Sequence, residues 1–243
     1  MKKKNKDTKA PAAKKAAKGT QVQMSESMTI GVLLTLAGGY FDAYTYIARG
    51  GVFANAQTGN IVLMGIRFFE GDYLRVLSYF IPVLAFVLGV FTAEMIKRFD
   101  NKLPVHWRQA VIALEMAIVI IVALLPVSEE NMYTYNMTAN VLISFVCSLQ
   151  VQSFRKIKGI VCATTMCTGN LRSGTDCLTQ YQKTGERTML MNGLKYYAIN
   201  LAFIAGAVIS AFVTKLTGGI SVIFCLIPLI TVFIIMFRKP LAL

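Results

Sequence analysis

Six long apolar segments leave this chain few ways to fold. A helix needs about 20 mostly apolar residues to cross the hydrocarbon core of a bilayer. Segments of about this length lie at residues 28–48, 77–96, 110–127, 136–154, 196–213 and 219–237. Charged residues make up 15% of the chain, whereas about a quarter is usual in soluble domains. We therefore predict an all-α membrane protein with six transmembrane helices in one transmembrane domain, residues 28–239.

Two pairs of matching strings indicate an internal duplication. The tripeptide Thr-Gly-Asn occurs at residues 58–60 and again at 168–170, each time between two long apolar segments. Further along, Leu-Ala-Phe-Val-Leu-Gly at 84–89 is followed by Leu-Ala-Phe-Ile-Ala-Gly at 201–206. Because both pairs occur in the same order and are flanked by apolar segments, chance recurrence is a poor explanation.

The duplication predicts two repeats, about 28–127 and about 136–237. The second contains a longer polar connection, roughly residues 173–195, which explains why the two pairs of strings are not equally spaced. Each repeat would cross the membrane three times, an odd number, so the second would enter from the opposite side. The halves would then be inverted repeats related by a pseudo-two-fold axis in the membrane plane.

The distribution of Lys and Arg predicts the orientation, because these residues are in excess in cytoplasmic connections. They are frequent in the N-terminal tail and after the second, fourth and sixth apolar segments. The connection after the third segment instead holds Glu129 and Glu130 and no cation. Both termini are therefore predicted to be cytoplasmic. The first connection is an exception, since it contains Arg49, Arg67 and Arg75.

The N-terminal tail, residues 1–27, has a composition typical of disorder. Eight lysines lie within its first 18 residues, among Ala, Pro, Gly and Asn, and such a tract cannot bury apolar surface. We expect this basic cytoplasmic tail to bind anionic lipid headgroups, at about 1 kcal/mol per cation near the surface. The net charge of +13 therefore does not indicate a nucleic-acid partner. The expected partners are the lipid bilayer and a small solute, and a homo-oligomer is compatible with the sequence.

The segment around the first Thr-Gly-Asn reads as an interrupted helix. A glycine-rich stretch precedes it, and residues 61–69 after it would form about 14 Å of helix, which is half a bilayer. This length is typical of a re-entrant half-helix. Irregular backbone at such depth persists only where it is buried in protein or lines a watery cavity.

Candidate binding residues in the first copy are Asn55, Gln57, Thr58, Gly59 and Asn60. Thr58 is suited to be the N-cap of the half-helix, and Gly59 permits close approach or unusual backbone angles. The amides of Asn55, Gln57 and Asn60 offer donors and acceptors to a solute or to each other.

Candidate residues in the second copy are Thr168, Gly169, Asn170 and Arg172. Arg172 would add a full charge to the partial positive charge at a half-helix N-terminus. Two such termini meeting from opposite sides would favour a small anionic or neutral polar solute. A second interpretation stays open, in which Thr-Gly-Asn makes tight contacts between helices because small residues let membrane helices approach closely.

Asp42 is a carboxyl residue within the first apolar segment. Insertion of such a residue costs about 2.5–3.5 kcal/mol, so Asp42 should face the interior and have a partner. At the 110-residue offset of the repeat its counterpart is Gln152. A proton relay and a structural hydrogen bond to the opposite half are both open roles for Asp42.

No catalytic, metal or cofactor site is predicted. The five cysteines include no Cys-x-x-Cys pair, and the only histidine, His106, lies in a basic connection. The sequence has neither a Ser-His-Asp arrangement nor a His-Glu-x-x-His motif, so we do not expect an enzyme.

The string Phe-Ala-Asn-Ala-Gln-Thr-Gly-Asn at 53–60, together with Ala-Gly-Gly-Tyr-Phe-Asp-Ala-Tyr-Thr-Tyr at 37–46, resembles the YoaK-like bacterial membrane protein family. This is a domain-of-unknown-function family of six-span proteins, and the resemblance covers roughly residues 28–239. It implies a multi-pass protein of the bacterial inner membrane and assigns no substrate or catalytic residue.

The function that agrees best with these features is a small-solute channel or transporter with a central site at the paired Thr-Gly-Asn segments. A non-transporting membrane scaffold or sensor is the alternative, and a membrane enzyme is less favoured.

Overall fold

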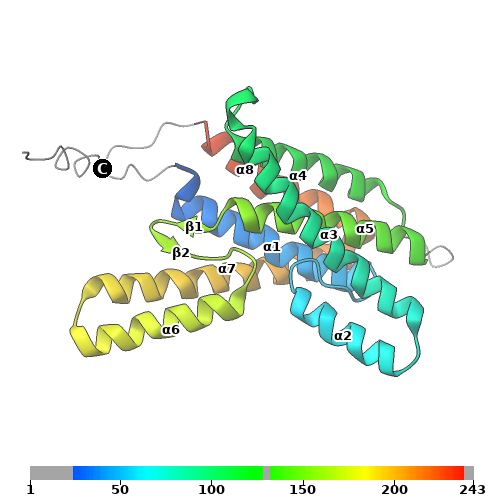
Figure 1. Ribbon diagram of the computed structural model, residues 1–243, viewed down its shortest axis with the longest axis horizontal. Helices are drawn as coiled ribbons and strands as arrows, with labels where there is room; N and C mark the ends of the chain where they lie inside the picture. The colour runs from blue at the N-terminus through cyan, green and yellow to red at the C-terminus, as the bar shows by residue number, and fades with distance from the viewer. Residues whose placement is uncertain (1–23, 128–131, 238–243) are drawn as a thin grey trace, which may run out of the picture.

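The computed structural model describes residues 24–127 and 132–237 (Figure 1). Residues 1–23 of the predicted tail lie outside the described residues. The end of the tail that is described is ordered, because Met24–Glu26 form a 3-10 turn. Ser27 then caps the first helix by accepting a hydrogen bond from the Ile30 amide at 3.3 Å.

The described chain is mostly helical, and its first half contains helices α1 to α4. Their bounds are α1 (Met28–Ala48), α2 (Gln57–Phe69), α3 (Tyr73–Arg98) and α4 (Trp107–Leu124). The second half contains α5 (Met132–Ser153), β1 (Lys156–Ile157), β2 (Ile160–Val161), α6 (Cys167–Thr184), α7 (Arg187–Thr217), a 3-10 segment (Gly218–Cys225) and α8 (Leu226–Ile235).

The predicted apolar segments all fall on helical structure, and α1 has the predicted bounds. Within the described residues, three helical stretches are long and apolar enough to cross a membrane by length and composition: Tyr73–Arg98, Trp107–Leu124 and Arg187–Ile235. Many large apolar side chains on the outer faces of α3 and α7 are exposed, among them Phe91 and Phe212. Exposed apolar surface of this extent is characteristic of contact with lipid.

Two local features of the second half were not predicted from the sequence. The chain is not entirely helical, because β1 and β2 pair as a short antiparallel hairpin. The turn of this hairpin contains Lys158 and Gly159, both with positive φ. In addition, the stretch 173–195, expected as a polar connection, is helical in α6 and α7. Polar residues on one exposed helix face look like a connection when only hydropathy is considered.

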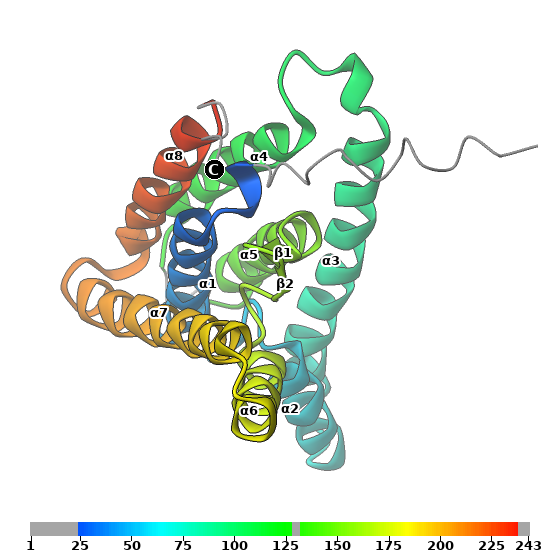
Figure 2. The same cartoon turned by 90° about the vertical axis from the view of Figure 1, so that its left-hand side faces the viewer.

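The helices of the two halves pack on each other in a corresponding way. Helix α1 packs along α7, and α5 packs along α3. Helix α2 packs on α3, just as α6 packs on α7. Figure 2 shows α1 and α5 lying between α7 and α3. The first long helix of each half therefore contacts the third helix of the other half.

Glycines permit the close approach of these helix pairs. A Cβ atom at Gly206 of α7 would overlap the Leu36 carbonyl of α1. A Cβ at Gly89 of α3 would overlap the Ser148 hydroxyl of α5. Gly89 and Gly206 are the last residues of the two matching strings found in the sequence. The recurring glycine therefore has the same packing role in both halves.

Candidate functional site

The two chain segments that precede α2 and α6 meet at the middle of α1. We call residues 49–56 entry loop 1 and residues 162–166 entry loop 2. In entry loop 1, Asn55 Nδ2 donates to the Gly38 carbonyl at 2.9 Å. A Cβ at Gly38 would also lie 3.4 Å from the Thr164 carbonyl and 3.2 Å from Thr165 Cγ2 in entry loop 2. Gly38 is the central residue of α1, so both breaks in the helical structure occur at the same level of the molecule.

Helices α2 and α6 leave this meeting point in opposite directions (Figure 1). The partially positive N-terminal end of each helix therefore points toward the centre of the molecule.

The two asparagines of the repeated tripeptide hold their own entry loops. Asn60 Oδ1 accepts from the Phe53 amide at 3.0 Å, and its Nδ2 donates to the Phe53 carbonyl at 2.7 Å. Asn170 Nδ2 donates to the Ala163 carbonyl at 2.8 Å. Both asparagines are buried, and both contact the residue seven positions earlier. The repeated motif thus marks an equivalent loop clamp, and these amide groups are engaged within the chain.

Asp42 is buried and also contacts entry loop 1. Its Oδ1 accepts a hydrogen bond from the Asn55 backbone amide at 2.6 Å, and the residue is 7% exposed. The carboxyl group therefore lies close to the start of α2, where backbone N–H groups have no partner within the helix. An acidic group is stabilised at this end of a helix.

The predicted equivalence of Asp42 and Gln152 is wrong. Gln152 Nε2 donates to Glu94 Oε1 on α3 at 2.5 Å. It is Gln150 that reaches the other entry loop, donating to Thr164 Oγ1 at 3.1 Å. Between this position and the repeated tripeptide, the second copy, which contains the hairpin, is two residues longer, so the offset here is 108 residues instead of 110.

The predicted N-cap role of Thr58 is also wrong. Helix α2 begins at Gln57, and its N-cap residue, Ala56, makes no side-chain hydrogen bond. Gln57 Nε2 instead donates to the Ala54 carbonyl at 2.7 Å and to Ser144 Oγ of α5 at 3.3 Å. Gln57 therefore ties the start of α2 to α5.

The remaining tripeptide residues are less alike than their letters suggest. Thr58 and Thr168 are both exposed. A Cβ at Gly59 would lie 3.1 Å from the Phe53 ring, whereas Gly169 faces open space. Arg172 is exposed on α6, five positions after the helix begins, so it is outside the buried group formed by the entry loops.

Sequence reasoning missed the structural role of Arg49, which it counted only as a loop charge. The Arg49 side chain is 1% exposed. Its Nε donates to the Tyr44 hydroxyl at 2.8 Å, Nη1 to the Pro126 carbonyl at 3.0 Å and Nη2 to the Leu125 carbonyl at 3.0 Å. Two longer hydrogen bonds of 3.4 Å complete the set. A guanidinium group is favourable at the carbonyl end of α4, where the helix carries partial negative charge.

The signal that could have revealed Arg49 was its disagreement with the charge distribution. It lies in a connection that the charge distribution predicts to be outside the cytoplasm, and Gly50 and Gly51 follow it with φ values of 88° and 78°. An arginine that violates the orientation pattern is a candidate for burial. Arg67, in the same connection, instead forms an exposed ion pair with Glu70 at 2.6 Å.

Glu115 is a further buried charged residue, and it was not among the predicted site residues. It lies in α4 and is fully buried. Neither of its carboxyl oxygens has a hydrogen-bond partner within residues 24–127 and 132–237. Among the same residues, no group of three or more His, Cys, Asp and Glu side chains is placed to hold a metal ion.

The apolar helices, their exposed outer faces and the buried breaks at Gly38 define a helical membrane protein with multiple apolar helices. The chain belongs to the family described as "Protein of unknown function (DUF1275)", whose model matches residues 30–236. It is 26% identical over 185 residues to the UPF0700 transmembrane protein YoaK of Bacillus subtilis (strain 168). The matched region covers 74% of this chain and 80% of that relative. The family resemblance seen in the sequence is thereby confirmed. No solved structure shows significant similarity to the chain.

Proposed function

We propose that this protein is a channel or transporter for a small polar solute, with an anion as the alternative solute class. The observation that carries the proposal is the meeting of the two entry loops at Gly38, halfway along α1. Non-helical backbone at membrane depth is tolerated where it is buried in protein or lines a water-filled cavity. Paired breaks of this kind are characteristic of transport sites near the bilayer midplane.

The proposal includes six spans arranged as two inverted repeats of three, in a bacterial inner membrane with both termini cytoplasmic. The spans would be α1, α3, α4, α5, α7 and the 3-10 segment with α8, while α2 and α6 would be half-helices. Exchange of packing partners between the halves supports this arrangement, because α1 lies along α7 and α5 along α3. The clamps by Asn60 and Asn170 support it as well.

Free acceptor groups at the meeting point favour a solute that carries hydrogen-bond donors. Asn55 Oδ1 and Gln150 Oε1 are buried and have no hydrogen-bond partner among the described residues. Their amide nitrogens are fixed by carbonyl groups of Gly38 and Leu34 on α1. Asp42 already places a carboxyl group at the start of α2, which favours a neutral polar solute over an anion in that half.

Flux into proteoliposomes tests the proposal. Purified protein would be reconstituted and assayed with small uncharged solutes such as urea and glycerol, and with small anions such as formate and nitrate. We expect flux above that of empty liposomes for at least one solute, and a reduced flux for Asn55→Leu. Asn101→Leu is the matched control, since Asn101 is exposed in the 3-10 turn Asp100–Lys102 between α3 and α4 and belongs to neither entry loop.

The outcomes separate the candidate functions. A solute that crosses equally fast with Asn55→Leu and with the unmodified protein would argue against a site at the entry loops. Flux no greater than in empty liposomes for every solute class would favour a scaffold or sensor.

A further inference from the structure

The exposed faces of the two half-helices differ sharply in polarity. Helix α2 exposes apolar side chains: Ile61, Val62, Ile66, Phe68 and Phe69. Helix α6 exposes one large apolar side chain, Leu171, and otherwise mostly polar and charged ones, among them Thr168, Arg172, Thr175, Asp176, Thr179, Gln180 and Lys183. The two helices start from equivalent loop clamps, so this difference is not explained by their place in the fold.

The first turns of α6 lie beside an apolar part of α7. Asn200 Nδ2 of α7 donates to the Cys167 carbonyl at 3.3 Å. A Cβ at Gly174 would lie 3.0 Å from Tyr196 Cβ. Residues 167–174 therefore run antiparallel to residues 196–200, at the beginning of the apolar segment 196–213.

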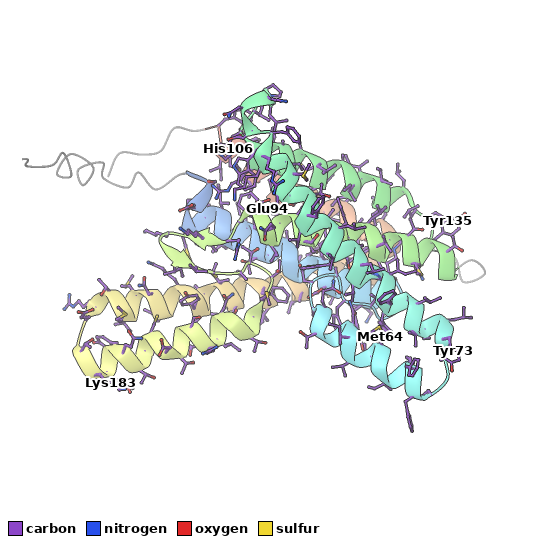
Figure 3. The ribbon with its side chains drawn as sticks, in the orientation of Figure 1. Met64, Tyr73, Glu94, His106, Tyr135 and Lys183 are labelled. Carbon is purple, nitrogen blue, oxygen red and sulfur yellow. The ribbon has the colours of Figure 1, made fainter. Side chains whose placement is uncertain are left out.

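The start of α6 also lies close to the middle of α1, because entry loop 2 contacts Gly38. A helix rises about 1.5 Å per residue, so the first ten residues of α6 cover about 15 Å, or half the hydrocarbon thickness. In the proposed topology, Thr168, Arg172 and Thr175 are therefore exposed at membrane depth. Lys183 marks the outer end of the helix (Figure 3).

Exposure of this face to lipid would be unfavourable. A charged arginine in contact with the hydrocarbon region is costly, and such residues normally face protein or a water-filled cavity. Helix α2 at the corresponding positions has Val62 in place of Arg172 and Gly65 in place of Thr175. The α2 face is suited to lipid and the α6 face to water.

We propose that the exposed face of α6 lines a water-filled vestibule that leads from the cytoplasm to the entry loops. The inference rests on the proposed transport function, and it identifies the cytoplasmic part of the solute route. A second copy of the chain is a less suitable occupant of this face, because the centres of protein interfaces are depleted of charged residues. Here Arg172, Asp176 and Lys183 are spread along the face.

Cysteine accessibility in membrane vesicles tests this inference without requiring flux. Single cysteines would be introduced as Arg172→Cys and Thr175→Cys, with Val62→Cys and Gly65→Cys as matched controls on α2. The background would carry Cys167→Ala and Cys177→Ala, because these two native thiols are partly exposed while the other three are buried. A membrane-impermeant methanethiosulfonate would be applied separately to each side of the membrane, and the thiols left unmodified would be counted with a maleimide of high mass.

We expect the two α6 cysteines to react at least about tenfold faster than the two α2 cysteines, because the reactive thiolate forms in water and not in lipid. The reaction should require reagent on the cytoplasmic side. Equal rates on α2 and α6, or oxidative cross-linking of Thr175→Cys into dimers with slow labelling, would overturn the vestibule. Fast labelling of α6 without any solute flux would support the vestibule and count against the proposed transport. Solute flux together with α6 cysteines that stay unlabelled would support the proposed transport and count against the vestibule.

Discussion

Replacement of Arg49 is the sharpest test of how the end of α1 is held to the end of α4. Three of its five hydrogen bonds, to the Tyr44 hydroxyl and to the Pro126 and Leu125 carbonyls, are 2.8–3.0 Å long. A lysine ammonium is a single point on a flexible stem and cannot reproduce the planar fork of donors. With Arg49→Lys we expect the loss of at least two of these bonds, at about 1.5 kcal/mol each for a charged donor. The total is about 3 kcal/mol.

Thermal unfolding in detergent measures this loss. For a chain of about this size, 1 kcal/mol shifts the Tm by about 2–4 °C, so Arg49→Lys should lower the Tm by about 6–12 °C. In a background with Cys167→Ala and Cys177→Ala, a thiol-reactive fluorophore can follow the transition, since the three remaining cysteines are buried in the folded protein.

Arg75→Lys is the matched control. Arg75 is partly exposed and its side chain donates a single hydrogen bond among those described, to the Gly50 carbonyl at 3.2 Å, so its replacement should change stability by no more than about 0.5 kcal/mol. Arg49→Met, which removes every hydrogen bond, should shift the Tm further than Arg49→Lys. The Tm of Arg49→Lys is expected to lie at least about 6 °C below that of Arg75→Lys. If the two Tm values differ by no more than about 1 °C, the bonds to the end of α4 do not stabilise the fold and the reasoning is refuted.

Other substitutions test the remaining contacts by the same Tm measurement. Gly206→Ala should destabilise the fold by about 1–3 kcal/mol, the usual effect of overpacking. Gly169 faces open space, so Gly169→Ala should be neutral or slightly stabilising in a helix. Equal Tm shifts for the two variants would contradict the role of the glycine contact. Asn60→Ala should lower the Tm more than Asn170→Ala, because Asn60 makes three hydrogen bonds through its amide and Asn170 makes two; the opposite order would contradict the loop clamps. Glu115→Gln should leave the Tm unchanged or raise it. The glutamine keeps the shape of a buried side chain that makes no hydrogen bond among the described residues, and it cannot carry a charge. A fall in Tm of several degrees would indicate that the carboxyl group is needed.

Features that depend on composition over a long stretch were predictable. Apolar segments of about 20 residues can satisfy both their side chains and their backbone in a bilayer only as helices, and the helical membrane architecture is confirmed. The duplication was also visible, because Gly89 and Gly206 perform the same close packing in both halves. The six-span inverted arrangement stays a prediction that follows from counting crossings.

The sequence by itself determined the apolar helices, the places where they are broken and the family. Only the tertiary structure decided which side chains serve those breaks. It showed that Asn60 and Asn170 hold their own loops, that Gln150 takes the position expected for Gln152, and that Arg49 binds the end of α4. These contacts join residues on different elements, so they depend on the rotation of each helix about its axis and on loop length. A shift of two residues turns a helical side chain by more than half a circle, which is why a repeat offset alone could not identify the correct partner.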